Sequence, residues 1–260
     1  MKLSFLSLLL ILCFPTLSKS QEQAWWKPAV RTKWAIQFSN LPILLIPEAE
    51  VQNIDLYDTD ETVIDLLHKN GKKVICYFSA GSFENWRSDA IDFPLEILGK
   101  NLDGWEGERW LDIRRLDKLV PIMTKRFDLA VKKKCDGIDV DNLDGYTQKS
   151  GFDLSYLDQI NYNKMLATQA HDRGLGIGLK NDLNQILDLV NDYDWAINEE
   201  CFEYKECHLL LPFIEKGKPV FQIEYKGKSS DFCPKANGFQ FSSLKKKLNL
   251  DGWVESCSKF

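Results

Sequence analysis

The stretch CDGIDVDNLDGY, residues 135–146, has the alternation of a buried strand in its middle and acidic residues toward its end. Residues 116–133 before it and residues 156–172 after it carry apolar side chains at steps of three and four, the spacing of amphipathic helices. A short strand between two helices is typical of a parallel sheet. The stretch therefore predicts one βα unit of an α/β protein.

Short apolar segments of this kind recur along the chain, and residues 62–69 and 182–189 add helical spacing between them. Eight such strands predict a single (β/α)8 barrel of the TIM type, and an open doubly wound sheet is the alternative, because periodicity does not show closure. Residues 80–111 would then form a long loop at the face of the barrel that usually builds the binding site. The expected strands are residues 34–38, 51–56, 73–78, 137–141, 176–179, 195–198, 219–223 and 238–241.

The N-terminus has the layout of a signal peptide, with Lys2 before an apolar run and small or polar residues at positions 16–20. We expect residues 1–20 to be removed and residues 21–260 to form one extracellular domain without a membrane span, the alternative being a single N-terminal anchor. The chain has 33 basic and 38 acidic residues. This balance argues against nucleic acid as a partner and would suit a cationic ligand.

The cysteines indicate disulfide bonds, because an even number remains in an exported chain once Cys13 leaves with the leader. Several pairings are possible. Cys201 and Cys207 are close enough for a local loop, Cys233 with Cys257 would fasten the C-terminal tail, and Cys76 with Cys135 would be the remaining pair. A zinc site is the less favoured alternative, since the spacing contains no paired CxxC units.

Two acidic positions follow apolar strands and carry the functional hypothesis. Asp139 and Asp141 point to one side of an extended chain, and they point into the barrel if Ile138 and Val140 face the helices. Glu199 directly follows a later strand. Hydrolysis of a glycoside needs one carboxyl group to protonate the leaving oxygen and another to attack the anomeric carbon or activate water. A solvated acidic loop, a calcium site or helix caps are the alternatives.

The residues that metal-dependent and serine hydrolases need are not found in the expected positions of this sequence. The histidines His68, His171 and His208 do not follow a strand, so we expect no catalytic metal and no cofactor. Ser79 and Ser82 lie outside a G-x-S-x-G elbow and have no histidine nearby in the sequence to act as a base. Aromatic residues in or beside the predicted loops suit the flat faces of sugars: Tyr77, Trp86, Trp105, Trp110, Tyr146 and Tyr225.

Six ordered motifs together resemble glycoside hydrolase family 114, the endo-α-1,4-polygalactosaminidases. The resemblance implies a barrel that hydrolyses α-1,4-linked galactosamine polymers, with Asp141 and Glu199 as the catalytic carboxylates. It implies that further residues line the substrate site: Asp55, Tyr77, Ser79, Glu84, Asp139, Asn142, Lys180, Asn198 and Glu224. The motifs are ICYFSAGSFENWR, GWEGERWLDI, CDGIDVDNLDGY, GLKND, INEECFEYKEC and FQIEY, between about residues 34 and 225.

By analogy with other α-retaining barrel enzymes, Asp141 would be the nucleophile and Glu199 the general acid and base. The surplus acidic residues would then hold the ammonium groups of an amino-sugar polysaccharide, the expected partner of a monomeric secreted enzyme. A carbohydrate-binding barrel without turnover and a structural protein of the secreted matrix are the alternative functions.

Overall fold

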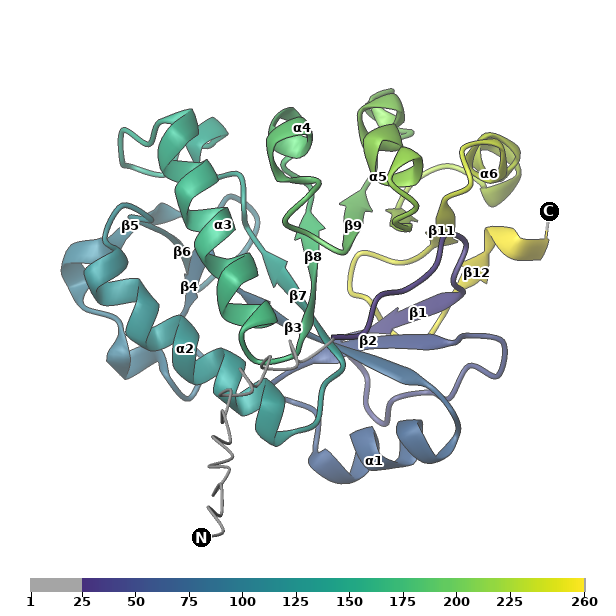
Figure 1. The fold of residues 1–260 in the computed structure, drawn as a ribbon, viewed down its shortest axis with the longest axis horizontal. Coiled ribbons are helices and arrows are strands. Elements are labelled where there is room, and N and C mark those ends of the chain that lie inside the picture. The colour runs from purple at the N-terminus through teal and green to yellow at the C-terminus, as the bar shows by residue number, and fades with distance from the viewer. Residues whose placement is uncertain (1–24, 260) are drawn as a thin grey trace, which may run out of the picture.

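The computed structural model describes residues 25–259, so the expected signal peptide, residues 1–20, lies outside the described residues. Its main sheet contains eight parallel strands in chain order and a short antiparallel ninth, β12 (Glu255–Ser256) (Figure 1). A doubly wound sheet would reverse its strand order partway, and this sheet does not. The predicted TIM-type barrel is therefore confirmed. The parallel strands are β1 (Trp34–Gln37), β2 (Val51–Asp55), β3 (Lys73–Ser79), β7 (Gly137–Asp141), β8 (Gly176–Lys180), β9 (Trp195–Glu199), β10 (Val220–Glu224) and β11 (Ser242–Lys245).

Helices connect the strands from β2 onward and lie outside the sheet (Figure 1). A capping box begins α3, where the Ser155 hydroxyl accepts from the amide of Asp158 and the Asp158 carboxylate accepts from the amide of Ser155. No described helix is both long and apolar enough to cross a membrane. The helices are α1 (Glu61–Lys69), α2 (Leu116–Lys132), α3 (Tyr156–His171), α4 (Ile186–Leu189), α5 (Leu211–Glu215) and α6 (Ser229–Gly238).

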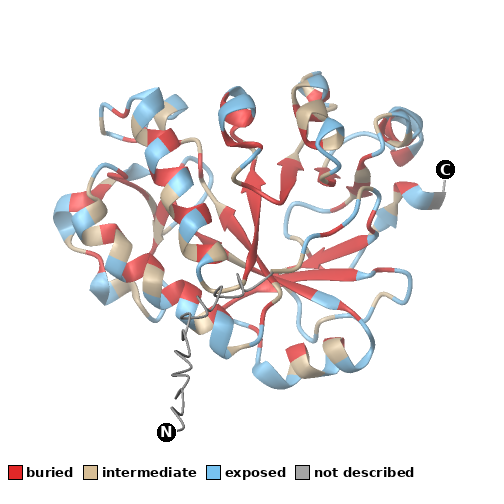
Figure 2. Cartoon of the chain, viewed as in Figure 1, coloured by how far each residue is buried: buried red, intermediate tan, exposed pale blue. Residues whose placement is uncertain are grey.

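Alternation along the strands separates an inner core from an outer one, and the strands are buried on both faces (Figure 2). Trp195 fills the barrel interior without any solvent exposure. A Cβ atom on Gly178 would lie 2.1 Å from the indole Nε1 of Trp195, and one on Gly137 would lie 2.5 Å from its Cη2. Glycine at these positions of β7 and β8 therefore makes room for the indole ring.

Two expectations about local structure are wrong. The eighth strand is β11, not residues 238–241, because Gly238 ends helix α6 and the chain turns before it enters the sheet. Residues 80–111 are also more than a loop, since they contain a small antiparallel sheet in the order β4–β6–β5. Its strands are β4 (Ser82–Glu84), β5 (Leu98–Asn101) and β6 (Glu108–Leu111).

The first and last parallel strands close the barrel without a shared strand ladder. The indole Nε1 of Trp34 donates to the carbonyl of Ser242 at 2.7 Å, and the amide of Phe38 donates to the carbonyl of Leu250 at 2.9 Å. A cavity of about 300 Å³ lies beside this seam. Side-chain and loop hydrogen bonds thus replace the strand pairing here.

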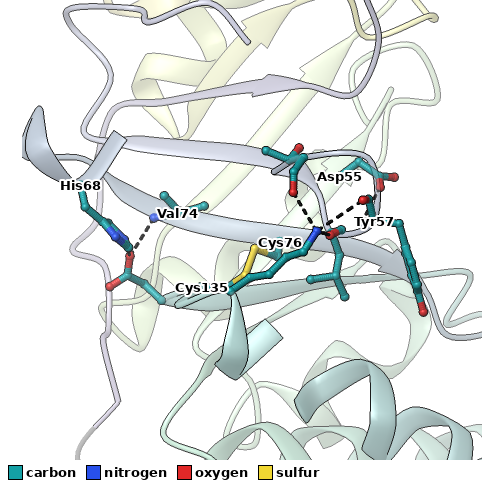
Figure 3. The surroundings of a disulfide bond; sticks show 10 residues. Asp55, Tyr57, His68, Val74, Cys76 and Cys135 are labelled. Atoms are coloured by element: carbon teal, nitrogen blue, oxygen red, sulfur yellow. Dashed lines mark hydrogen bonds and ion pairs between the residues drawn. A yellow bond between two sulfur atoms is a disulfide. The ribbon is translucent and has the colours of Figure 1, made fainter. Parts of the chain in front are cut away.

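Three disulfides are present and join Cys76 to Cys135, Cys201 to Cys207 and Cys233 to Cys257. This is the pairing favoured by the sequence. Figure 3 shows the first of them, which ties β3 to the segment after α2, between His68 on one side and Tyr57 on the other.

Removing the Cys76–Cys135 disulfide should cost more stability than removing Cys201–Cys207. The first closes a sequence separation of 59 residues and the second one of 6. Because a longer closed loop restricts the unfolded chain more, the Cys76→Ala/Cys135→Ala variant should lose about 2 kcal/mol more free energy of unfolding than Cys201→Ala/Cys207→Ala. Urea denaturation of the two variants measures the difference. An equal or reversed loss would contradict the prediction.

Candidate active site

Three polar side chains meet at the C-terminal ends of three neighbouring strands. Asp141 ends β7, Lys180 ends β8 and Glu199 ends β9, and these strands pair side by side. Ile138 and Val140 pack against the helices, so the alternation of β7 directs Asp141 to the interior. The C-terminal face of a TIM-type barrel is where active sites are built.

Lys180 lies between the two carboxylates. Its Nζ is 3.2 Å from Oδ1 of Asp141 and 3.1 Å from Oε2 of Glu199. The lysine side chain is only 5% exposed, whereas those of Asp141 and Glu199 are 21% and 26% exposed. Burial lowers the pKa of Lys180, but the charges of Asp141 and Glu199 outweigh it and raise that pKa above its usual value. One fixed positive charge therefore holds two carboxylates that solvent can reach.

A tyrosine donates to the second oxygen of each carboxylate. The hydroxyl of Tyr77 donates to Oδ2 of Asp141 at 3.0 Å, and the hydroxyl of Tyr225 donates to Oε1 of Glu199. Burial and the neighbouring carboxylates raise the pKa of both tyrosines, which keeps them protonated as donors. Asp141 and Glu199 are thus each oriented by the shared lysine and by one phenol.

Asp55 and Glu84 lie together because both contact the guanidinium group of Arg87. The guanidinium of Arg87 is 2.7 Å from Oδ2 of Asp55 and 2.9 Å from Oε1 of Glu84, and all three side chains are buried. Burial raises the pKa of Glu84, although its hydrogen bond to Arg87 opposes the shift. These acids therefore contribute a reduced negative charge to the site.

Ser79 and Asn142 belong to a hydrogen-bonded network that continues into the small sheet. The Asn142 amide donates to the hydroxyls of Ser79 and Ser82 at 2.9 and 3.1 Å, and Ser82 donates to Oε2 of Glu108 at 2.8 Å. Glu108 was not expected at the site. Burial raises its pKa to about 7. Glu108 lies in the motif GWEGERWLDI, which could have marked it as a site residue from the sequence. Only the pairing of β4 with β6 brings it to Ser82.

Asn198 and Glu224 do not lie with the carboxylate pair. Each is one residue out of phase with the inward-facing positions of its strand. Oδ1 of the Asn198 side chain accepts from the backbone amide of Cys201 at 3.2 Å, and Oε1 of Glu224 accepts from the backbone amide of Phe202 at 2.8 Å. Both side chains therefore order the loop after β9, and Tyr225 takes the inward position next to Glu224.

The whole described fold corresponds to one protein family. The model of glycoside-hydrolase family GH114 matches residues 15–260. The chain belongs to family GH114. It is an O-glycosyl hydrolase. A comparison with curated proteins found no match.

One of the similar solved structures is also similar in sequence, and two others are similar in fold only. The structure of Aspergillus fumigatus Ega3 in complex with galactosamine is 42% identical, with a TM-score of 0.84 and coverage of 90% of this chain and 98% of that one. The glycoside hydrolase domain of PelA from Pseudomonas aeruginosa is 13% identical, with a TM-score of 0.67 and coverage of 86% and 98%. Trehalulose synthase MutB from Pseudomonas mesoacidophila MX-45 is 10% identical, with a TM-score of 0.53 and coverage of 74% and 56%. The last two show the fold alone.

Asp139 lies beneath the exposed part of the hydrolase site. It is fully buried, and its Oδ2 accepts from the Asn53 amide at 2.7 Å. Burial raises the pKa of Asp139 to about 7, with Lys180 lowering it and Asp141 raising it further. Asp139 is therefore out of reach of a substrate, and it affects Asp141 and Lys180 through electrostatic interaction. Among residues 25–259, no cluster of histidine, cysteine or acidic side chains could hold a metal ion.

Asp139 should make the stability of the hydrolase depend on pH. Its folded pKa of about 7 lies above its ordinary value of 3.8, so folding retains a proton between these values. The resulting stabilisation is complete below pH 3.8 and is lost as the pH rises through 7. Between about pH 5 and 8 the parent protein should lose on the order of 2 kcal/mol of its free energy of unfolding through Asp139, and the Asp139→Asn variant should not show this part of the loss. Urea unfolding at both pH values tests this, and parallel losses in the two proteins would contradict it.

Proposed function

We propose that this hydrolase is a secreted, endo-acting enzyme that cleaves α-1,4-linked galactosamine-containing polysaccharide, with residues 1–20 as its signal peptide and residues 21–260 as its catalytic domain. The 42% identical Ega3 structure was solved with galactosamine, which supports an amino sugar as substrate. Three disulfides support an extracellular location. The observation that carries the proposal is the pair of accessible carboxylates on either side of Lys180.

Asp141 attacks the anomeric carbon in this proposal while Glu199 protonates the departing glycosidic oxygen. Glu199 begins protonated and Asp141 ionised, so the first step leaves the sugar bonded to Asp141 and Glu199 without its proton. Water then attacks the anomeric carbon and gives a proton to Glu199, which releases the Asp141 carboxylate and restores the protonated Glu199. Oδ1 of Asp141 and Oε2 of Glu199 cannot be farther apart than the sum of their distances to Nζ of Lys180. Retaining enzymes have their two carboxyl groups about 5 to 5.5 Å apart, and a shared lysine ammonium group keeps Asp141 and Glu199 close together in the way that retention needs.

The surroundings of Asp141 favour a cationic substrate. Asp55 and Glu84 share Arg87 as their cation. Burial raises the pKa values of Glu108 and Asp139 to about 7, so both side chains are partly charged at neutral pH and add to the negative potential. An ammonium group on the sugar gains from such a potential, whereas an acetamido group does not. We therefore expect deacetylated polymer to bind better than acetylated polymer near Asp141.

Incubation of the purified mature chain with deacetylated α-1,4-galactosamine polymer tests the activity. Mass spectrometry should detect a series of oligosaccharides early in the digest, because an endo-acting enzyme cuts within chains. Release of single sugars alone would contradict endo action. Intact polymer at high enzyme concentration would contradict the proposed substrate.

Retention predicts that the new reducing ends form first as the α anomer. Proton NMR during the first minutes of the digest distinguishes this anomer from the β anomer before mutarotation mixes them. Because two displacements at the anomeric carbon restore its configuration, the α signal should rise first. Early appearance of the β signal would instead assign Glu199 or Asp141 to activation of water.

A further inference from the structure

A cavity of about 340 Å³ lies at the same face of the barrel, beyond Tyr225. Its lining comes from the turn before α6 and the first residues of that helix, and from the segment around β11 and β12, which lies next to them (Figure 1). Tyr225, two residues before this lining begins, donates to Glu199. The cavity is therefore on the catalytic face, and its lining begins two residues after a tyrosine that contacts the proposed acid. It is lined by Gly227, Lys228, Ser229, Ser230, Lys245, Trp253 and Glu255.

Trp253 offers a fixed aromatic surface to this cavity. Its side chain is 39% exposed, whereas a large apolar ring usually gains from full burial. Its backbone is held on both sides, because its amide donates to Oδ1 of Asp251 at 2.9 Å and its carbonyl accepts from Nζ of Lys246 at 2.7 Å. Nζ of Lys247 lies 5.8 Å from the centre of the ring, so a sugar would stack on the ring face that Lys247 leaves open.

The charges at the cavity differ from those beside Asp141. Lys228 and Lys245 form no ion pair with any residue in the described part of the chain. The nearby Lys226 is different, since it is 3.5 Å from Glu200 and 3.6 Å from Glu203. Glu255 is the acidic residue of the lining, and its Oε2 accepts from the hydroxyl of Ser229 at 2.7 Å. An ammonium group entering the cavity would meet two unpaired cations and one acid.

We propose that this cavity is a second sugar-binding subsite that takes a hexose unit without an ammonium group, either N-acetylated or unsubstituted, stacked on Trp253. The inference rests on the proposed function, because the same polymer would also place an amino sugar beside Asp141. The enzyme then recognises a pattern along its substrate, with an ammonium-bearing unit near the acids of β2, β4 and β6 and a neutral unit near β11.

Binding of polymer to variants in an Asp141→Asn background tests the subsite without hydrolysis. The probes are fully deacetylated α-1,4-galactosamine polymer and the same polymer after acetic anhydride has acetylated about half of its amines. Trp253→Ala should weaken binding of the half-acetylated probe about five- to tenfold and leave the deacetylated probe within about twofold, as measured by titration calorimetry. Trp253→Phe should restore most of the affinity, because it keeps a flat ring.

The charge of the lining provides a second test that does not depend on Trp253. Lys228→Glu should tighten binding of the deacetylated probe about threefold or more, whereas the matched change Lys235→Glu, within helix α6 and outside the lining, should not. Equal effects of Trp253→Ala on both probes, or no effect on either, would overturn the subsite. Failure of the parent Asp141→Asn protein to bind either probe would overturn the proposed function together with the subsite.

Discussion

Replacing Asp141 by asparagine should reduce hydrolysis of deacetylated galactosamine polymer on the order of 10³- to 10⁵-fold. An amide has nearly the same shape as the carboxylate but cannot form the bond to the anomeric carbon. It can still accept from the hydroxyl of Tyr77, so the folded structure should persist. The measurement is the initial rate of reducing-end formation, together with the urea midpoint as a check on folding.

Asp136 provides a matched control for this substitution. It precedes the same strand at the opposite end of the barrel, where it is paired with His68 and Lys73. Asp136→Asn should alter stability but leave the rate nearly unchanged, whereas Glu199→Gln should resemble Asp141→Asn. A rate near that of the parent protein in the Asp141 or Glu199 variant would refute the catalytic pair.

Lys180→Met should lower both the rate and the stability. The variant retains Asp141 and Glu199 but removes the cation that both contact. Loss of one partner from a buried ionic group typically costs about 3 to 5 kcal/mol, and we expect about 2 to 4 kcal/mol because the two acids are partly exposed. The rate should fall about 10²- to 10³-fold, since the carboxylates lose their fixed orientation.

Lys72→Met separates these two effects. Lys72 is also buried, but it donates to the carbonyls of Ile46, Pro47 and Ala49 away from the carboxylate pair. This variant should lose stability without a comparable loss of rate per folded molecule. An unchanged rate in Lys180→Met would contradict a role in orienting them.

Local sequence patterns were sufficient for the parts of the protein that depend on neighbouring residues. Alternation in β7 placed Asp139 and Asp141 on one side, because side chains in a strand point to opposite faces in turn. The capping box of Ser155 and Asp158 is likewise local, because its donors and acceptors lie within one turn at the start of α3. The positions of Asp141 and Glu199 at strand ends also followed from the pattern, whereas Lys180 was expected at the site from the family resemblance.

Contacts between distant segments could not be predicted in this way. A shift of one residue in phase reverses the direction of a side chain, and this turned Asn198 and Glu224 outward and Tyr225 inward. Glu108 reaches the site only through the pairing of β4 with β6.

The sequence alone therefore determined which strands carry the acids, because alternation and helical spacing are local properties of the chain. Tertiary structure decided which side chains share a partner. It placed one ammonium group between two carboxylates, and it positioned the C-terminal segment against β1 through hydrogen bonds between residues far apart in the chain. Such contacts depend on how the whole barrel closes, which no single segment specifies.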